Sequence, residues 1–278
     1  MARGTLLVVA TPIGNLDDLT PRAREALAGA ALVAAEDTRR TGQLLAHLGL
    51  RRPLVACHRF SEARTVAQIL GELERGAAVA LVTDGGTPAV SDPGYRLVAA
   101  AHEAGHDVRA VPGASAVAAA LSVAGLPADS FHFAGFLPSR RSARRREIER
   151  LAPIADTLVL FEAPHRLVEC LADLSELLGV RTAVICRELT KLHEEVRRGT
   201  LAELHAEFAA RERVLGEIVL VIAGARGPAP AATAAEPDLP SRFVAALRDQ
   251  DEDVERALHH LARELGIARA ELRRRLQL

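Results

Sequence analysis

The sequence predicts an α/β protein with two domains and a small helical appendage at its carboxyl end. Short apolar runs typical of buried strands alternate with amphipathic helical patterns along the first 225 residues. Several of these runs end in turns rich in glycine and proline, the places where ligands bind in open α/β sheets. The chain has 278 residues, which is enough for two domains of ordinary size.

The first domain is expected over residues 1–125. Thr20 followed by Pro21 is a favourable helix start, and Gly105 is a favourable helix end. Strands are predicted at Thr5–Ala10, Leu32–Ala35, Leu54–His58, Ala77–Val82 and Val108–Val111, and helices from Thr20 and at Ser61–Arg75, Pro93–Gly105 and Ala114–Leu121. The first strand is apolar throughout, as expected for a buried parallel strand.

The second domain is expected over residues 126–225, after a hinge at Gly125-Leu126-Pro127. Strands are predicted at Phe131–Phe136, Thr157–Phe161, Arg181–Cys186 and Gly216–Gly224, and a helix at Thr200–Arg211. Residues 226–240 contain four prolines and predict a Pro/Ala-rich linker. Residues 241–278 predict two or three amphipathic helices with a break resembling a helix-turn-helix at Leu265-Gly266-Ile267.

The loop Asp84-Gly-Gly-Thr-Pro-Ala-Val-Ser-Asp-Pro-Gly94 is the strongest functional signal in the chain. It follows a buried strand, so Asp84 lies at the end of the strand where ligands bind. Gly85 and Gly86 permit positive φ and a close approach of a ligand to the main chain. Pro88 and Pro93 stiffen the loop and lower the entropy cost of holding it around a ligand. The alternative is an ordinary glycine-rich turn.

Polar clusters follow two other predicted strands. Glu36-Asp37-Thr38-Arg39-Arg40 places two acids and two arginines at a strand end, where burial requires pairing or contact with a substrate. The structural alternative is Asp37 as a helix N-cap beside exposed arginines. His165 follows the strand at 157–161 and is compatible with a general base, an RNA contact or a polar residue at a helix start.

Charge is distributed unevenly, although the formal net charge is only −1. Residues 140–150 hold six arginines against two glutamates, and a local basic patch of this kind can bind phosphate. The alternative is a solvated helix face. The chain has a single lysine, Lys191, among 34 arginines, which suggests a position where a flexible point charge is needed.

Three classes of protein are disfavoured. No apolar run reaches the length that a membrane helix needs, and no signal peptide is recognisable, so we expect no membrane association. Cys57, Cys170 and Cys186 show no metal-ligand spacing, so we expect no metal site, and their odd number fits a reduced cytoplasm. The first strand is followed by Thr11-Pro12-Ile13-Gly14-Asn15 in place of G-x-G-x-x-G, which argues against a conventional Rossmann domain.

Six blocks together resemble the tetrapyrrole methylase family, and in particular its ribosomal RNA branch. They are Pro12-Ile13-Gly14-Asn15, Ala35-Glu36-Asp37-Thr38-Arg39, the loop at 84–94, Val111-Pro112-Gly113-Ala114-Ser115-Ala116, Gly135-Phe136-Leu137-Pro138 and Arg187-Glu188-Leu189-Thr190-Lys191. The resemblance covers about residues 4–224, with the blocks in family order. It implies two α/β domains with the cofactor in the cleft between them, and a homodimer.

The resemblance also implies the chemistry. S-adenosylmethionine would donate a methyl group to the ribose 2′-oxygen of a cytidine in the decoding centre of 16S ribosomal RNA, with the small ribosomal subunit as partner. The cofactor-binding residues implied are Pro12, Gly14, Asp84, Gly85, Gly86, Thr87, Pro88, Val90, Pro112, Gly113, Ser115, Ala116, Phe161, Glu162, Gly216 and Ala223. Those expected to contact RNA are Arg39, Arg40, Arg140, Arg141, Arg144, Arg145 and Arg166.

The donor is already activated, so alignment of donor and acceptor is the main catalytic task, with a base that takes the hydroxyl proton. Asp37, His165 and Lys191 are candidates by residue type, and a lysine would need a lowered pKa. Two other functions stay open at this point. One is methylation of a tetrapyrrole or precorrin on the same fold, and the other is a non-catalytic RNA-binding assembly factor.

Overall fold

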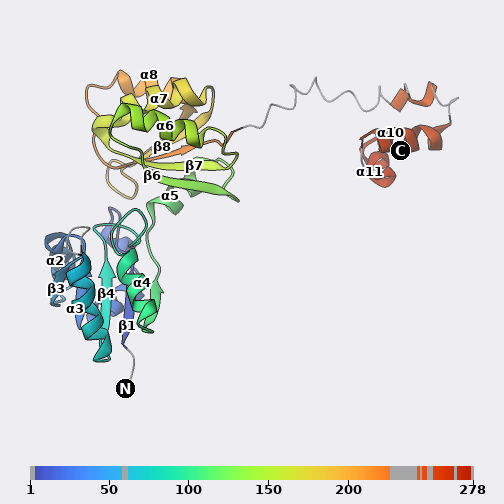
Figure 1. Ribbon diagram of the computed structural model, residues 1–278. Helices are drawn as coiled ribbons and strands as arrows, with labels where there is room; N and C mark the ends of the chain where they lie inside the picture. Colours follow the sequence, from blue (N-terminus) through green and yellow to red (C-terminus); the bar gives the residue numbers. More distant parts are fainter. Residues whose placement is uncertain are drawn as a thin grey trace. The chain divides into compact units, whose positions relative to one another are not determined.

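The computed structural model describes residues 4–57, 62–225, 243–244, 246–248, 253–265 and 268–276. The chain divides into two compact units, one up to residue 225 and one from residue 226. The first unit holds two sheets and the second holds helices only, as far as the described residues go (Figure 1).

The first sheet has five parallel strands in the order β3-β2-β4-β1-β5. Its strands are β1 (Thr5–Val9), β2 (Leu32–Ala35), β3 (Leu54–Ala56), β4 (Ala78–Val82) and β5 (Asp107–Val111). Its helices are α1 (Pro21–Gly29), α2 (Thr38–His47), α3 (Glu62–Glu74) and α4 (Tyr95–Glu103), with a short 3₁₀ helix η1 (Leu16–Asp18). The five strands expected in this half are therefore confirmed.

Helices cover both faces of this sheet. Leu6, Val79 and Leu81 point to one face of the sheet and pack with α3 and α4. Val33 and Val82 point to the other face and pack with α1 and α2. Figure 1 shows α3 and α4 in front of β1 and β4. Because all five strands run in the same direction, their carboxyl ends meet at one edge, where loops can build a site.

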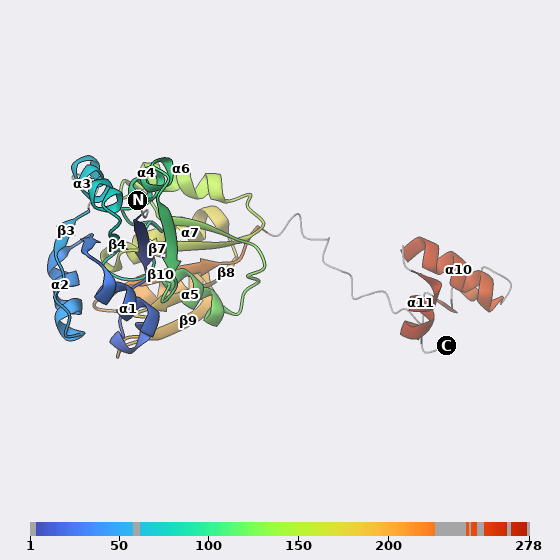
Figure 2. The ribbon, with the colours of Figure 1, turned by 90° about the horizontal axis from the view of Figure 1, so that it is seen from below.

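The second sheet is mixed, with the order β6-β7-β10-β8-β9. Its strands are β6 (Phe131–Phe136), β7 (Thr157–Glu162), β8 (Thr182–Arg187), β9 (Glu195–Thr200) and β10 (Ile218–Ile222). Helices α6 (Arg141–Leu151), α7 (Leu167–Leu178) and α8 (Leu201–Ala209) cover one face, and α5 (Ala116–Ala124) covers the other. Figures 1 and 2 show α5 on the side of this sheet that faces the first domain. Thus α5, which precedes the expected boundary at residue 125, packs on the second sheet.

Strand β9 is the one strand of this sheet that the sequence did not predict. It pairs antiparallel with β8 along residues 195–200. Strand β9 lies at the edge of the sheet, and its side chains are largely exposed. It therefore shows no alternation of apolar and polar residues, and it contains Glu195, Arg197 and Arg198. Charged edge strands are common because they discourage pairing with other chains, and they leave a weak pattern in the sequence.

The second unit contains α10 (Val254–Leu265) and α11 (Arg269–Leu276). The two helices share a small core of Phe243, Ala257, Leu258, Leu261, Ala262 and Leu272. The helical character predicted for 241–278 is confirmed where it is described. The linker predicted at 226–240 lies outside the described residues, as do Gly266 and Ile267 of the predicted break. None of the helices described in the chain is both long and apolar enough to span a bilayer.

Candidate active site

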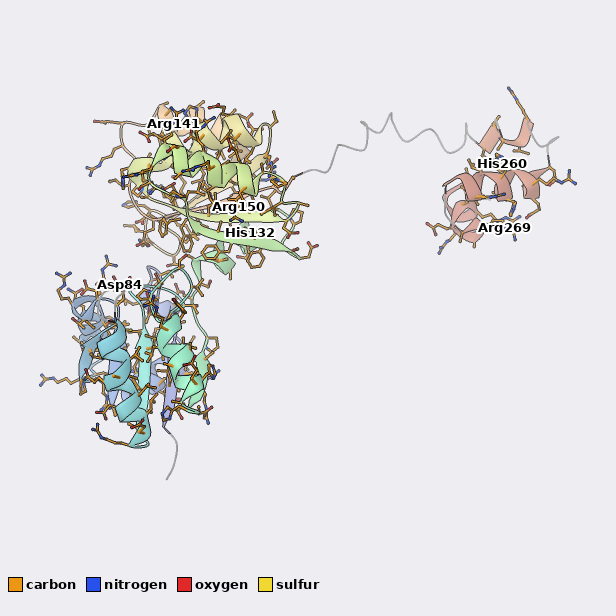
Figure 3. All side chains as sticks on the ribbon, viewed as in Figure 1. Asp84, His132, Arg141, Arg150, His260 and Arg269 are labelled. Carbon is orange, nitrogen blue, oxygen red and sulfur yellow. The ribbon has the colours of Figure 1, made fainter. Side chains whose placement is uncertain are left out.

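A cavity of about 810 Å³ opens where the two sheets of the first unit meet. The carboxyl ends of β1, β2 and β4 form one side, and the ends of β7 and β8 with the start of β10 form the other. Figure 3 shows Asp84 at the end of the first domain that faces the second domain. The volume is in the range of sites for small molecules and cofactors.

Two carboxylates lie side by side on the first-sheet side of the cavity. The Thr83 hydroxyl donates to Glu36 Oε2 at 2.5 Å, and the backbone N–H of Asp37 donates to Asp84 Oδ1 at 3.0 Å. Burial, together with the negative charge of Glu36, raises the pKa of Asp84. Arg40 lies 3.4 Å from the other oxygen of Asp84. The cavity therefore presents negative charge that suits a cationic ligand.

The loop at 84–94 is held to the loops after β1 and β5 by hydrogen bonds. Thr11 and Gly86 exchange two backbone hydrogen bonds of 2.9 Å, and Thr87 Oγ1 donates to the Ala114 carbonyl at 3.3 Å. Gly86 has a φ of +92°, the positive value that a glycine permits. Gly85, the other glycine of the pair, lines the cavity. Ala89 and Ser91 also have positive φ, a strained conformation that tends to occur at functional sites.

Lys191 stands on the opposite side of the cavity. Its ammonium donates to Glu188 Oε1 at 2.7 Å and to Glu217 Oε2 at 3.1 Å. Partial burial opposes the charge on Lys191, but these two hydrogen bonds outweigh it and raise the pKa. Gly216, with a φ of +93°, leaves the space that Glu188 occupies, because a Cβ there would lie 2.4 Å from Glu188 Cγ. Lys191 is thus held as a cation, contrary to the neutral amine that a base requires.

The expected cofactor residues divide into two sets. Pro12, Gly14, Asp84, Gly85, Ala116, Phe161, Glu162 and Gly216 line the cavity, whereas Gly86, Thr87, Pro88, Val90, Pro112, Gly113, Ser115 and Ala223 do not. Most of the second set belong to the loops that support the lining residues, and Ser115 is the N-cap of α5. Ala223 is different, because it follows β10 at the end opposite to the cavity, where its N–H donates to the Thr182 carbonyl. That position conflicts with the prediction that Ala223 contacts the cofactor.

Of the three candidate bases, the structure brings only Lys191 to the cavity wall. Asp37 is the N-cap of α2 and accepts hydrogen bonds from the side chain and backbone of Arg39, which hold its pKa far below the usual range. Asp37 therefore has the N-cap position that the structural alternative predicts, and its role as a base stays a prediction. His165 is exposed in the 3₁₀ helix η2 (Pro164–Arg166), next to the lining residue Pro164.

The arginines expected to contact RNA are mostly engaged in ion pairs. Arg40 lines the cavity, while Arg39 is exposed and paired with Asp37 at 2.7 Å. Arg166 is largely buried, bridging Glu162 at 3.0 Å and the Leu137 carbonyl at 2.7 Å. Arg39 and Arg166 therefore already have acidic partners within the chain.

The arginine run at 140–150 lies on α6 and faces acids of α7. Arg144 is 1% exposed and lies 2.7 Å from Asp173, so it is internal and does not present its guanidinium to a surface ligand. This position contradicts its predicted role as an RNA contact. Arg145 makes two hydrogen bonds to Glu176, of 2.6 and 2.7 Å, and Arg141 lies 3.2 Å from Asp173. Figure 3 shows Arg141 on the side of the second domain away from Asp84. Arg140 and Arg146 are exposed.

Several lining residues were not expected from the sequence. Glu36, Thr11 and Thr83 stand at strand ends, the same signal that identified Asp84. Thr41, Gln43, Leu44 and His47 come from α2, and Phe136, Cys186, Leu189, Glu217, Ile218 and Val219 come from the second sheet and its loops. These side chains are ordinary helix and strand residues, so only the tertiary structure places them at the cavity.

The class of protein follows from sequence similarity to a family of methylases. The family described as tetrapyrrole (corrin/porphyrin) methylases matches residues 5–205, and the chain belongs to this family. The resemblance derived from the sequence is confirmed.

Within the family, the chain is similar to proteins named ribosomal RNA small subunit methyltransferase I. The protein from Xylella fastidiosa (strain Temecula1) is 51% identical over 224 residues, which are 80% of this chain and 82% of the relative. The protein from Pseudomonas aeruginosa is 48% identical, over 82% of each chain. The protein from Mycobacterium tuberculosis (strain H37Rv) is 51% identical, over 81% of this chain and 79% of the relative.

Solved structures agree on the fold. The uroporphyrin-III-C-methyltransferase from Thermus thermophilus matches with a TM-score of 0.55 and 25% identity, over 80% of this chain and 93% of that chain. The methyltransferase CobJ matches with a TM-score of 0.60 and 21% identity, over 80% and 95%. The expected fold class of two α/β domains is therefore confirmed.

Proposed function

We propose that this protein transfers a methyl group from S-adenosylmethionine to the ribose 2′-oxygen of a cytidine in the decoding centre of 16S ribosomal RNA. The observation that carries the proposal is the 48–51% identity, over about four fifths of the chain, to proteins named ribosomal RNA small subunit methyltransferase I. Conservation of this extent across the cavity-bearing unit supports a shared reaction. The cavity supplies a physical rationale for each part of it.

The methyl donor carries a sulfonium and an ammonium, and both are cations. Asp84 and Glu36 give the first-sheet side of the cavity its negative charge, which attracts such a ligand. Gly14, Gly85 and Gly216 line the cavity, so main-chain groups form part of its wall on both sides. Phe161 and Val219 offer apolar surface for the adenine. We propose that these residues, with Pro12, Ala116 and Glu162, form the donor site.

The acceptor oxygen becomes a better nucleophile as its proton leaves. The ion pairs with Glu188 and Glu217 favour the ammonium form of Lys191, which has no lone pair to take that proton. An ammonium beside the oxygen instead stabilises the negative charge that develops there. We propose that Lys191 has this role, and that alignment of donor and acceptor supplies most of the rate enhancement.

The remaining predictions concern partners. We propose that Arg40 at the cavity wall, with Arg39, Arg140 and Arg141, contacts phosphates of the RNA, because these side chains retain exposure. The homodimer implied by the resemblance and the expected cytoplasmic location stay predictions. A size-exclusion measurement of the mass in solution tests the dimer.

The test is transfer of a labelled methyl group from S-adenosylmethionine to three acceptors, namely isolated small ribosomal subunits, free 16S RNA and a porphyrinogen. The product RNA is then hydrolysed with alkali. A ribose 2′-O-methyl group protects its phosphodiester from cleavage, because the attacking hydroxyl is absent, whereas a methylated base does not. Label in an alkali-resistant dinucleotide that contains cytidine is expected. Label on the porphyrinogen would support the tetrapyrrole alternative, and no transfer with retained RNA binding would support the assembly factor.

A further inference from the structure

Three phenylalanines gather beside the cavity in a chain that has few aromatic residues. The sequence contains seven phenylalanines, one tyrosine and no tryptophan. The ring centroids of Phe133 and Phe161 lie 5.0 Å apart, and those of Phe136 and Phe161 lie 5.5 Å apart, both in edge-to-face geometry. Phe136 lines the cavity and is 58% exposed. The cluster therefore fixes one ring whose outer surface is open at the cavity.

A β-bulge turns Phe136 toward that cavity. Phe133 pairs with Val159 of β7, and the register then shifts, so that Gly135 pairs with Leu160 and Phe136 with Phe161. Without the shift, Phe136 would pair with the next residue of β7. Its side chain would then lie on the opposite face of the sheet, with Leu158 and Leu160. The bulge keeps it on the face of Val159 and Phe161, which α5 covers. Bulges near active sites commonly re-aim a side chain in this way.

The strand end that carries Phe136 is held from two sides. Gly135 has a φ of +63°, and a Cβ there would lie 2.8 Å from Ser91 Oγ in the loop at 84–94. Arg166, itself paired with Glu162, donates to the carbonyl of Leu137 at 2.7 Å. The ring of Phe136 is thus preorganised, so little conformational entropy is lost when a ligand covers it.

We infer that Phe136 is the platform on which the target nucleobase stacks when its ribose enters the cavity, an inference that rests on the proposed function. Phe136 adds apolar aromatic surface to the cavity wall, and a ligand gains free energy by covering such surface. RNA bases that are recognised in single-stranded segments stack on exposed aromatic rings. Enzymes that modify a base turn the nucleotide out of its stack and hold the base between aromatic or apolar side chains, and we infer that the same kind of contact holds the base here. Phe136 accordingly positions the acceptor and leaves the methyl donor to the residues deeper in the cavity.

The experiment compares Phe136→Ala, Phe136→Leu and Phe136→Trp with Phe131→Ala. Phe131 is the matched control, because it begins the same strand, is 46% exposed and does not line the cavity. Binding of the small subunit and of S-adenosylmethionine is measured separately, and transfer is followed in single turnovers. The Ala and Leu variants are expected to bind the subunit roughly 5- to 150-fold more weakly, the range for loss of one base–aromatic stack. The Trp variant and Phe131→Ala should resemble wild type, with donor affinity unchanged throughout.

Two results would overturn the inference. One is a Leu variant that binds and methylates the subunit as wild type does, since Leu keeps the apolar contact but removes the stacking face. The other is a loss of donor affinity equal to the loss of subunit affinity, which would assign Phe136 to the adenine of the donor. Wild-type protein that binds the subunit without transferring methyl refutes the proposed function alone, and the subunit-binding comparison then still decides the role of Phe136.

Discussion

Gly14 and Lys191 are in contact, although they lie on loops of two different sheets. A Cβ added to Gly14 would lie 2.4 Å from Cγ of Lys191 and 2.8 Å from Oγ1 of Thr190. The N–H of Asn15 donates to the same Thr190 oxygen at 3.0 Å. A side chain at position 14 would collide with the loop that carries Thr190 and Lys191, so this position requires glycine. Gly14 thereby helps to set where the chain's single lysine lies in the cavity.

We predict that Gly14→Ala lowers the rate of methyl transfer by displacing Lys191. The new methyl group would force the lysine stem outward, because the Cβ would meet carbon at 2.4 Å. Thermal unfolding should change by only a few degrees, since the lysine is partly exposed. Gly71→Ala is the control, because that helical glycine has open space around it and its replacement should be neutral or slightly stabilising. Equal turnover in the two variants would show that the position of Lys191 does not affect the reaction.

Lys191→Arg should lower single-turnover methylation far more than it lowers affinity for S-adenosylmethionine. A planar guanidinium cannot reproduce the geometry of a compact ammonium between Glu188 and Glu217. Lys191→Met, which removes the charge, should be at least as slow. Because the pKa of Lys191 is raised, wild-type rates should show no loss from lysine deprotonation between pH 7 and about 9. A Lys191→Arg variant that works at the wild-type rate would remove this residue from the catalytic site.

Asp84→Asn should make the protein more stable at neutral pH and a weaker binder of the methyl donor. Burial and Glu36 raise the folded-state pKa of Asp84, so its ionised form destabilises the fold at any pH above both the folded and unfolded pKa. The gain from asparagine should therefore shrink as the pH falls and vanish below about 3, where the carboxyl is protonated in both states. Denaturation and calorimetric titration at pH 7 and pH 5 measure the two effects. A variant that binds the donor as tightly as wild type would show that the Asp84 charge does not attract the donor.

Within the arginine run, exposed and paired members should behave differently. The double change Arg140→Gln and Arg146→Gln should reduce the slope of log affinity against log salt by up to about 2 and spare stability. Arg144→Gln should instead destabilise the fold by about 2 kcal/mol, because it weakens the neutralisation of buried Asp173. Filter binding of RNA and chemical denaturation test both variants. A salt slope unchanged by the double variant would leave α6 as a solvated face.

Glu195 should link stability to acid pH through β9. It accepts from Arg211 at 2.7 Å and from Arg187 at 2.8 Å, and these arginines lower its pKa to about 2. A lowered carboxyl pKa stabilises the fold above the unfolded value of about 4.3, and that contribution disappears as the pH falls toward 2. Glu195→Gln should cost about 1–2 kcal/mol at pH 7, after allowance for solvent screening, and less at pH 3.5. Equal costs at the two pH values would contradict the ionic origin.

The loops around the cavity show how far the sequence leads. Asp84 was predicted to lie in the site because it follows a buried strand and precedes two glycines, and parallel strands bring their carboxyl ends together. The same rule applies to Glu36, which directly follows β2 and lines the cavity. The α2 residues Gln43 and His47 carry no such signal, because helix positions face a site only through packing.

Charge patterns in the sequence were weaker guides than turn patterns. The run at 140–150 is basic along the chain, but Asp173 and Glu176 of α7 lie against it in space. Ion pairing across two helices depends on how they pack, and a linear count of charges does not contain that information. Asp37 similarly has a strong local use as a helix N-cap, which competes with any catalytic use.

The sequence by itself determined the alternation of strands and helices, the family and the main loops of the site, because local periodicity and turn chemistry are properties of neighbouring residues. Only the tertiary structure decided which charges are paired, that Lys191 is held as a cation between two glutamates, and that a bulge turns Phe136 toward the cavity. Each of these depends on groups that are distant along the chain, and such groups meet only when the sheets form and pack.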